Sequence, residues 1–188
     1  MAGVQTPLVA PPRRAPVVTG PVRVAIGLDL GTHMGHAIVD MDGRRVESGV
    51  WHFEHRGREA KSDPGARILR AINMVGSYLA EAQARHRVVG VLYEIVRRHE
   101  GVQAAHVYGG LQWIVLAQCS RLGIDVDVAE VAALKTIATS KGNASKDDMV
   151  LAARRRWGID IHEQHAADEA DALWCADMLR RRVTGSVL

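Results

Sequence analysis

The sequence lacks any long apolar run and contains few cysteines and few aromatic residues. No stretch of roughly eighteen consecutive apolar residues occurs, so we expect no membrane-spanning helix. Its two cysteines, Cys119 and Cys175, lie in apolar patterns typical of helices, which favours buried thiols in a reducing, cytoplasmic setting over disulfides. Residues 1–20 contain no apolar core followed by a cleavage signal, so we expect no secretory peptide.

The charge is nearly balanced, and lysine is scarce. Against 21 acidic residues stand 24 basic ones, which gives a formal charge of +3 and an isoelectric point of about 9.1. Nearly all the basic residues are arginines, since the lysines are Lys61, Lys135, Lys141 and Lys146. A modest basic excess is compatible with a polyanionic partner but does not establish one. The scarcity of lysine makes each of these four a candidate for a specific role.

The length and composition favour one folded domain. A chain of 188 residues with 47% hydrophobic and 24% charged residues can bury one full core. Residues 1–20 are rich in proline and show no hydrophobic period, so we expect a flexible tail followed by a single domain over residues 21–188. A basic tail of this kind could touch nucleic acid, although a terminus without a specific role is the more common case.

Hydrophobic periodicity over this domain predicts an α/β fold. Alternating and continuous apolar runs predict strands, and apolar residues three and four apart predict helices. The expected strands are 22–32, 35–41, 44–53, 88–94 and 126–129, and the expected helices are 65–87, 101–122, 131–139, 146–157 and about 166–179. Asp42 and Gly43 are expected to form a two-residue hairpin turn. The order β-β-β-α-β-α-β-α-α-α predicts a mixed sheet flanked by helices, beginning with an antiparallel meander.

Acidic residues end two of the expected strands and open the last helix. Asp29 follows an apolar strand in which small residues alternate beside it, and Glu94 ends the continuous apolar run 88–94. On the last helix, Asp168 and Asp171 share a stripe with apolar residues. Taken alone, that pair is as compatible with the helix dipole, which accounts well for Glu169, as with a metal. Asp29 could likewise serve a turn, and Glu94 could pair with a nearby arginine.

The combination of these acids is more informative than any one of them. If the strands of Asp29 and Glu94 are parallel neighbours, both carboxylates reach the same end of the sheet, and Asp168 and Asp171 can close the group. Clustered carboxylates without buried arginines need protons or cations. Two magnesium ions about 3.5–4 Å apart, holding a phosphodiester for attack by water, are a known use of such a cluster.

The motifs, taken in order, resemble those of RuvC-type Holliday junction resolvases. The resemblance covers about residues 22–179 and is carried by Asp29-Leu30-Gly31, Tyr93-Glu94, the segment 135–146 and Asp168-Glu169-Ala170-Asp171-Ala172-Leu173. Val107-Tyr108-Gly109-Gly110-Leu111 is similar to the bacteriophage branch of the family. The resemblance implies an RNase H-like fold with a five-stranded mixed sheet, a homodimer, and cleavage of branched DNA such as four-way junctions and forks with Mg²⁺ or Mn²⁺.

The resemblance also implies roles for individual residues. Asp29, Glu94, Asp168 and Asp171 correspond to the metal-binding catalytic tetrad. Lys135 and Lys146 match lysines near the scissile phosphate, and Lys141 is assigned to contact with the DNA backbone. Three of the four lysines lie in this segment, and an ammonium group can approach a phosphate as a point charge. His165 is close enough in sequence to the acids to be an extra site residue.

One position departs from the family pattern. Where cellular members often carry an aromatic residue three positions after the glutamate, this chain has Arg97, followed by Arg98. An aromatic ring there can stack on an unpaired base, whereas arginine binds phosphate and stacks less specifically. We therefore expect Arg97 and Arg98 to contact DNA, with preference for four-way junctions in doubt. The helix 101–122, with small residues along one stripe, is the dimer surface that the resemblance implies, and packing on the sheet can occupy another of its faces.

Rival interpretations share parts of these motifs. Residues 27–32 resemble the first phosphate loop of the actin and hexokinase ATPases, but that fold needs a second phosphate loop, which the sequence does not contain. A nuclease of the YqgF type that acts on RNA begins in the same way. A non-catalytic protein that binds branched DNA is a third class, and the intact set of four acids argues against it.

Overall fold

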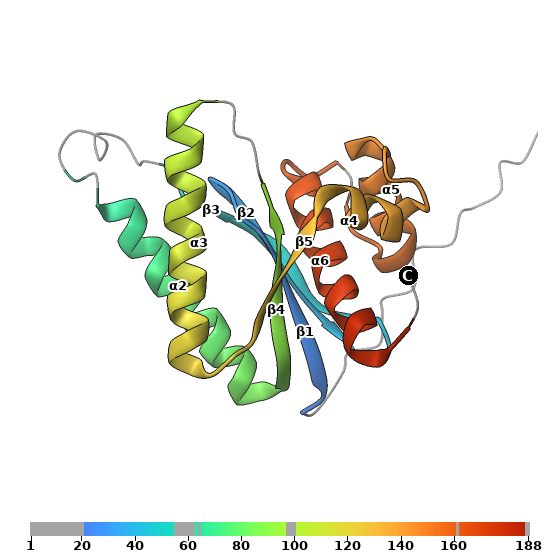
Figure 1. Ribbon diagram of the computed structural model, residues 1–188, viewed down its shortest axis with the longest axis horizontal. Coiled ribbons are helices and arrows are strands. Elements are labelled where there is room, and N and C mark those ends of the chain that lie inside the picture. Colours follow the sequence, from blue (N-terminus) through green and yellow to red (C-terminus); the bar gives the residue numbers. More distant parts are fainter. Residues whose placement is uncertain (1–20, 55–62, 64, 97–100, 161, 187–188) are drawn as a thin grey trace, which may run out of the picture.

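The computed structural model describes residues 21–54, 63, 65–96, 101–160 and 162–186. In these residues five strands and five helices follow the order predicted from the sequence (Figure 1). The strands are β1 (Arg23–Asp29), β2 (His33–Asp40), β3 (Arg45–His52), β4 (Arg87–Ile95) and β5 (Val126–Glu130). The helices are α2 (Ala66–Arg85), α3 (Val102–Leu122), α4 (Val131–Thr139), α5 (Lys146–Trp157) and α6 (Ala166–Thr184). The expected tail, residues 1–20, lies outside the described residues.

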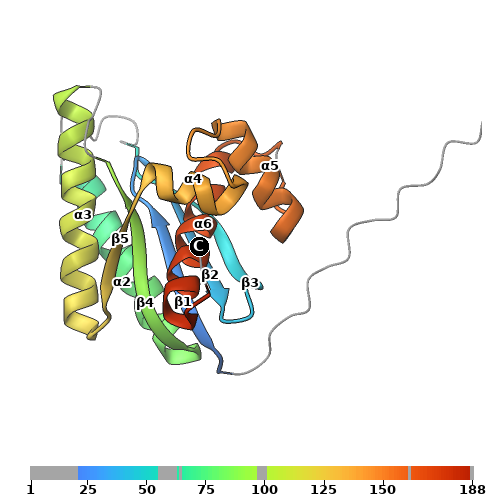
Figure 2. The ribbon, with the colours of Figure 1, turned by 45° about the vertical axis from the view of Figure 1, so that its right-hand side comes forward.

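The strands form one mixed sheet in the order β3-β2-β1-β4-β5. β1 pairs with β2, and β2 with β3, in antiparallel register, while β4 is parallel to both β1 and β5. Helices α2 and α3 cover one face, and α4, α5 and α6 cover the other (Figures 1 and 2). The predicted meander followed by parallel strands is confirmed, and β1 stands at the centre of the sheet between β2 and β4.

Each face of the sheet has its own apolar core. Alternation along β1 sends Val24, Ile26 and Leu28 into the core under α2 and α3, and Ala25 into the core under α4, α5 and α6. Cys119 lies in the first core and Cys175 in the second, both as buried free thiols, as the apolar patterns predicted. In the described part of the chain, no helix is long and apolar enough to cross a membrane.

The turn between β2 and β3 differs from the predicted two-residue hairpin. The strands end at Asp40 and resume at Arg45, and the Gly43 N–H donates to the Asp40 carbonyl at 2.9 Å. Met41 and Asp42 therefore occupy the centre of the turn, and Gly43 follows in the left-handed region with φ of +83°. Asp40 stabilises the longer loop, because its carboxylate accepts from the backbone N–H groups of Asp42 and Arg44. The turn predicted from the pair Asp-Gly is present, but it is longer than the predicted two residues.

Two glycines let α6 lie directly on the sheet. A Cβ atom on Gly27 would sit 1.9 Å from the Ala172 carbonyl oxygen, and one on Gly35 would sit 1.9 Å from that of Asp168. Any side chain at either position would force the helix away. This contact holds the first turns of α6 against β1 and β2, and it thereby positions the acids of α6 at the site.

Candidate active site

The parallel pairing of β1 and β4 brings two of the predicted acids together. Leu28 is registered with Tyr93, so the next residues, Asp29 and Glu94, lie side by side at the carboxyl ends of two neighbouring strands. Helix α3 fixes the end of β4, because the Tyr108 hydroxyl donates to the Glu94 carbonyl at 3.0 Å and accepts from the Val96 N–H at 3.3 Å. The strand therefore presents the Glu94 side chain in a defined place.

Helix α6 supplies the other two acids. It starts at Ala166 and lies on the glycines of β1 and β2, so Asp168 and Asp171 face the strand ends. All three other acids raise the pKa of Asp29 through their negative charge, which means that the four carboxylates share one electrostatic environment. The structure thus brings together the four acids that the sequence singled out.

A cavity of about 260 Å³ opens between these acids and helices α4 and α5. Asp29, Glu94 and Asp171 line one side, and Lys135 and Lys146 line the other. Lys135 projects from α4. Lys146 is the first residue of α5, a position fixed by a capping box in which the Asp148 N–H donates to the Ser145 hydroxyl oxygen at 3.1 Å and the Ser145 N–H donates back to the Asp148 carboxylate. Two ammonium groups and three carboxylates therefore surround a volume large enough for a phosphate group.

The raised pKa values of three of these acids show that ionising them together is unfavourable. Burial raises the pKa of Glu94 to about 7, with the charge of Asp171 adding to the rise and Lys146 and Lys135 opposing it. Burial also raises the pKa of Asp171 to about 6. The pKa of Asp29 is raised well above its usual value, first by burial and then by Asp171, Glu94 and Asp168. The two lysines are thus too weak a counter-charge for this many buried carboxylates.

The donor set fits divalent cations. Among the described residues, Asp29, Glu94 and Asp171 form no salt bridge within 4.0 Å with a basic side chain. Asp177, further along α6, shows the opposite arrangement: it is fully buried and pairs with Arg156, Arg180 and Arg181 at 2.8–2.9 Å. The chain therefore neutralises one buried acid with arginines and leaves the cluster at the strand ends with oxygen donors suited to hard cations such as Mg²⁺.

The remaining predicted residues fall in different places. His165 reaches Asp168, with 3.3 Å between its Nδ1 and a carboxylate oxygen, as expected of a residue beside the site. Lys141 is exposed on the loop before α5 and does not line the cavity. Arg97 and Arg98 lie outside the described residues, so their proposed contact with DNA stays a prediction.

The sequence pattern did not identify every residue of the site. The apolar wall of the cavity is formed by Val96, Val131, Leu134 and Met149, which resemble ordinary core residues in sequence. Glu169 was attributed to the helix dipole, yet it is buried, accepts a hydrogen bond from the Ser48 hydroxyl and lies 3.6 Å from Arg45. It holds α6 to β3, a contact that no local pattern signals.

Comparison with known proteins finds curated relatives over most of the chain. No protein-family model matches the chain. The crossover junction endodeoxyribonuclease RuvC of Anaeromyxobacter sp. (strain Fw109-5) is 30% identical over 154 residues, which cover 80% of this chain and 69% of that protein. The RuvC of Clavibacter michiganensis subsp. michiganensis is 25% identical over 173 residues, covering 86% and 81% of the two chains.

Solved structures show the same fold. RuvC of T. thermophilus in complex with a Holliday junction substrate superimposes with a TM-score of 0.69 at 23% identity, over 86% of this chain and 94% of that one. A second T. thermophilus RuvC structure gives a TM-score of 0.67 at 22% identity, over 87% and 97% of the chains.

A five-stranded mixed sheet with helices on both faces, and acids where its two central parallel strands end, defines an RNase H-like protein. Within that class, the chain belongs to the RuvC family of crossover junction endodeoxyribonucleases. The resemblance read from the sequence motifs is thereby confirmed at the level of fold, family and endonuclease class. Its assignment to a bacteriophage branch stays a prediction.

Proposed function

We propose that this protein resolves Holliday junctions, and cleaves related branched DNA, by metal-dependent hydrolysis of a phosphodiester in each of two strands. The observation that carries the proposal is the cluster of Asp29, Glu94 and Asp171 facing Lys135 and Lys146 across one cavity. Family membership supports the substrate, since a relative of this fold was solved with a Holliday junction.

The side chains divide the work between holding cations and holding phosphate. Asp29, Glu94, Asp168 and Asp171 would hold two Mg²⁺ or Mn²⁺ ions. Bound there, such ions would supply an activated water and stabilise negative charge on the phosphoryl oxygens. Lys135 and Lys146 donate to the non-bridging oxygens of the scissile phosphate and orient it towards the acids. The apolar wall of the cavity limits the access of bulk water and strengthens these contacts.

A second hollow adjoins the acidic cavity. It has a volume of about 470 Å³ and shares Val96 with the acidic cavity. Arg67, Thr32 and Gln103 line it, and each can donate a hydrogen bond to a phosphate. Substrate binding through such contacts should weaken steeply with salt, because released counterions dominate the affinity.

Symmetric nicking requires a second active site, and helix α3 supports a homodimer. Its exposed face carries Val102 and Trp113, which are 72% and 71% exposed. A different face of the same helix packs on the sheet through Tyr108, Leu111 and Val115. An isologous pair of α3 helices would place two acid clusters about one two-fold axis, as cleavage of two like strands requires.

The test is one cleavage assay with several substrates. A synthetic four-way junction, a fork, linear duplex DNA and structured RNA are incubated with the protein and Mg²⁺ or Mn²⁺, with binding measured in parallel. We expect metal-dependent nicks in the junction, abolished by Asp29→Asn and by Asp171→Asn while binding persists.

Three other outcomes would contradict the proposal or favour a different function. Cleavage by either variant at the rate of the unsubstituted protein would overturn the catalytic assignment. Preferred cleavage of structured RNA would favour a YqgF-type nuclease. Binding of the junction without cleavage at any metal concentration would favour a non-catalytic branched-DNA-binding protein.

A further inference from the structure

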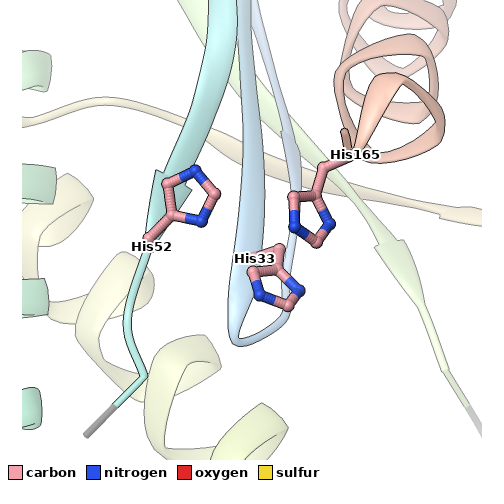
Figure 3. Close-up of side chains that lie close together, drawn as sticks. All are labelled: His33, His52 and His165. Atoms are coloured by element: carbon pink, nitrogen blue, oxygen red, sulfur yellow. The ribbon is translucent and has the colours of Figure 1, made fainter. Parts of the chain in front are cut away.

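Three histidines from separate elements meet beside the acidic site (Figure 3). His33 begins β2, His52 ends β3 and is its cross-strand partner, and His165 immediately precedes α6. One ligand atom from each lies within 4.8 Å of those of the other two. The rings of His33 and His165 stack with centroids 3.7 Å apart, and that of His52 stands 5.5 Å and 5.3 Å from them. Sequence reasoning gave no role to His33 or His52.

Carboxylates flank this cluster in the way that they flank metal-binding histidines. Glu54 hydrogen-bonds His33 and lies 3.8 Å from His52 Nδ1, and Asp168 lies 3.3 Å from His165 Nδ1. A histidine that binds a metal through one ring nitrogen almost always donates a hydrogen bond from the other, often to a carboxylate. His33 already has such a hydrogen bond, and His165 has a carboxylate close to its Nδ1.

The backbone of His165 is a second unusual feature. Its φ of +70° lies in the left-handed region, which among the described non-glycine residues it shares only with Ser140. That conformation is unfavourable for a residue with a side chain, so the surrounding structure must hold it in place. It aims the His165 ring at His33 and His52 instead of letting helix α6 start one residue earlier.

Simple ring packing is the alternative explanation. Stacked imidazoles do occur as surface packing, and His52 is exposed. Packing alone does not require nitrogen atoms from three elements to converge, nor carboxylates beside all three rings.

We propose that His33, His52 and His165 form a binding site for a divalent transition metal, with Zn²⁺ the preferred ion. Imidazole nitrogen favours Zn²⁺ over Mg²⁺, whereas the neighbouring carboxylates favour Mg²⁺. Zinc–nitrogen bonds of about 2.0–2.1 Å need ligand atoms within about 4 Å of one another. Small side-chain rotations achieve this, because the three elements already meet. Water takes the fourth position, and Glu54 keeps its hydrogen bond to His33.

Such a site would join the open ends of β2 and β3 to the start of α6. Zinc bound to the folded state and not to the unfolded chain stabilises the fold by mass action. The expected role is therefore structural: the ion fixes the first turn of α6, on which Asp168 stands, and the acidic site keeps its own hard cations.

The experiment measures zinc binding in a protein whose acidic site is weakened as a competitor by the loss of two of its four carboxylates. The full chain carrying Asp29→Asn and Asp171→Asn is stripped with chelator and titrated with Zn²⁺, and with Co²⁺ to record its visible absorption bands. We expect about one Zn²⁺ per chain, retained in excess Mg²⁺, and a Co²⁺ spectrum with nitrogen ligation. His33→Ala, His52→Ala and His165→Ala should each weaken zinc affinity at least about tenfold.

His162→Ala is the matched control, since His162 is an exposed histidine in the same loop as His165 and outside the cluster. It should bind zinc as the parent does. Circular dichroism establishes that each variant is folded, and His52→Ala, at an exposed strand end, keeps the test valid if His165→Ala unfolds. Absence of zinc binding by the parent, or unchanged binding by folded His33→Ala and His52→Ala, would overturn the proposal. Because cleavage is not measured, the result is independent of the proposed nuclease function.

Discussion

At the scale of single residues, the same helix treats buried acids in two ways. Asp177 receives three arginines, and its charge is fully compensated within the protein. Asp171, two turns earlier, faces Asp29 and Glu94 with two lysines across a cavity. A buried acid that is paired with arginines is neutralised within the fold, whereas unpaired buried acids repel one another until a cation relieves the repulsion. The contrast separates a structural carboxylate from a functional one without reference to any relative.

The repulsion gives a first prediction for Asp29→Asn. Burial and three neighbouring acids disfavour ionisation of Asp29, so replacing its carboxyl group by an amide that does not ionise should stabilise the metal-free protein. We expect the melting temperature at neutral pH to rise by about 2–4 °C, corresponding to roughly 1 kcal/mol for a domain of this size. Calorimetry in the presence of a chelator measures the effect. In saturating Mg²⁺, the unsubstituted protein should instead melt at a higher temperature than Asp29→Asn. A lower melting temperature for the variant in chelator would show that Asp29 is already compensated.

A second prediction concerns pH. Burial raises the pKa of Glu94 from its ordinary 4.5 to about 7 in the folded protein, so between these pH values the folded state holds more protons than the unfolded chain. The contribution of Glu94 to the stability of the metal-free protein should therefore be greatest below about pH 4.5, and it should be lost as the pH rises towards about 7. Metal affinity should change in the opposite sense, because the ion binds the deprotonated carboxylates. Mg²⁺ titration calorimetry between about pH 5.5 and 8 should show affinity rising steeply up to about pH 7.

The lysines supply a third prediction. Lys146→Ala should lower the cleavage rate by about 100-fold or more, because it removes a donor aimed at the phosphate in a partly dry cavity. Lys141→Ala should lower binding only slightly, since Lys141 is exposed and outside the cavity. Single-turnover rates on a four-way junction distinguish the two variants. Similar losses from both would mean that the lysines act only through overall charge.

Sequence alone identified the four acids but not the histidine cluster, and the reason is physical. Asp29 and Glu94 end apolar strands, and Asp168 and Asp171 interrupt an apolar helical stripe, so each acid breaks a local pattern that can be recognised. His33 and His52 break no pattern. They meet only through the register of β2 with β3, and they meet His165 only because α6 lies close to the sheet.

At the scale of elements, the contact of α6 with β1 and β2 determines the geometry of the site. Gly27 and Gly35 remove the side chains that would separate helix from sheet, with clearances too small for any Cβ atom. The order of the elements and most of their bounds were predictable from periodicity. The hairpin length was not, because Asp40 stabilises a longer turn than the Asp-Gly pair suggests.

This contact gives a fourth prediction, for Gly35→Ala. The added methyl group would overlap the Asp168 carbonyl, so α6 must shift, at a cost of about 1–3 kcal/mol in stability. The cleavage rate should fall even at temperatures where the variant is fully folded, because Asp168 moves with the helix. Gly110→Ala is the control: its methyl group would meet Ile68 at an ordinary 3.7 Å, and the gain in helix propensity should stabilise the protein by about 0.5–1 kcal/mol. Thermal melts and cleavage rates of both variants test the claim.

At the scale of the whole molecule, helix α3 has two faces with different tasks. The face with Tyr108 and Leu111 belongs to the core and fixes the end of β4, while the stripe with Val102 and Trp113 is exposed. The sequence predicted a stripe of small residues along this helix. It could not predict whether that stripe packs on the sheet or is exposed, because small residues suit both helix packing on a sheet and contact between subunits. The fold places this stripe on the opposite face of the sheet from α6 (Figures 1 and 2).

The last prediction follows from the exposed stripe. Trp113→Glu puts a charge at the centre of the proposed dimer surface, and we expect it to convert a dimer into a monomer in sedimentation experiments, because burying an unpaired carboxylate is costly. The folded core should not change, since Trp113 is 71% exposed. The monomer should still nick one strand of a four-way junction but should lose paired, symmetric nicks. Leu151→Glu, at an exposed apolar position of α5 on the opposite face of the sheet, is the matched control and should remain dimeric. A dimer that persists in Trp113→Glu would place the interface elsewhere, while paired nicks by a proven monomer would remove the need for a dimer in cleavage.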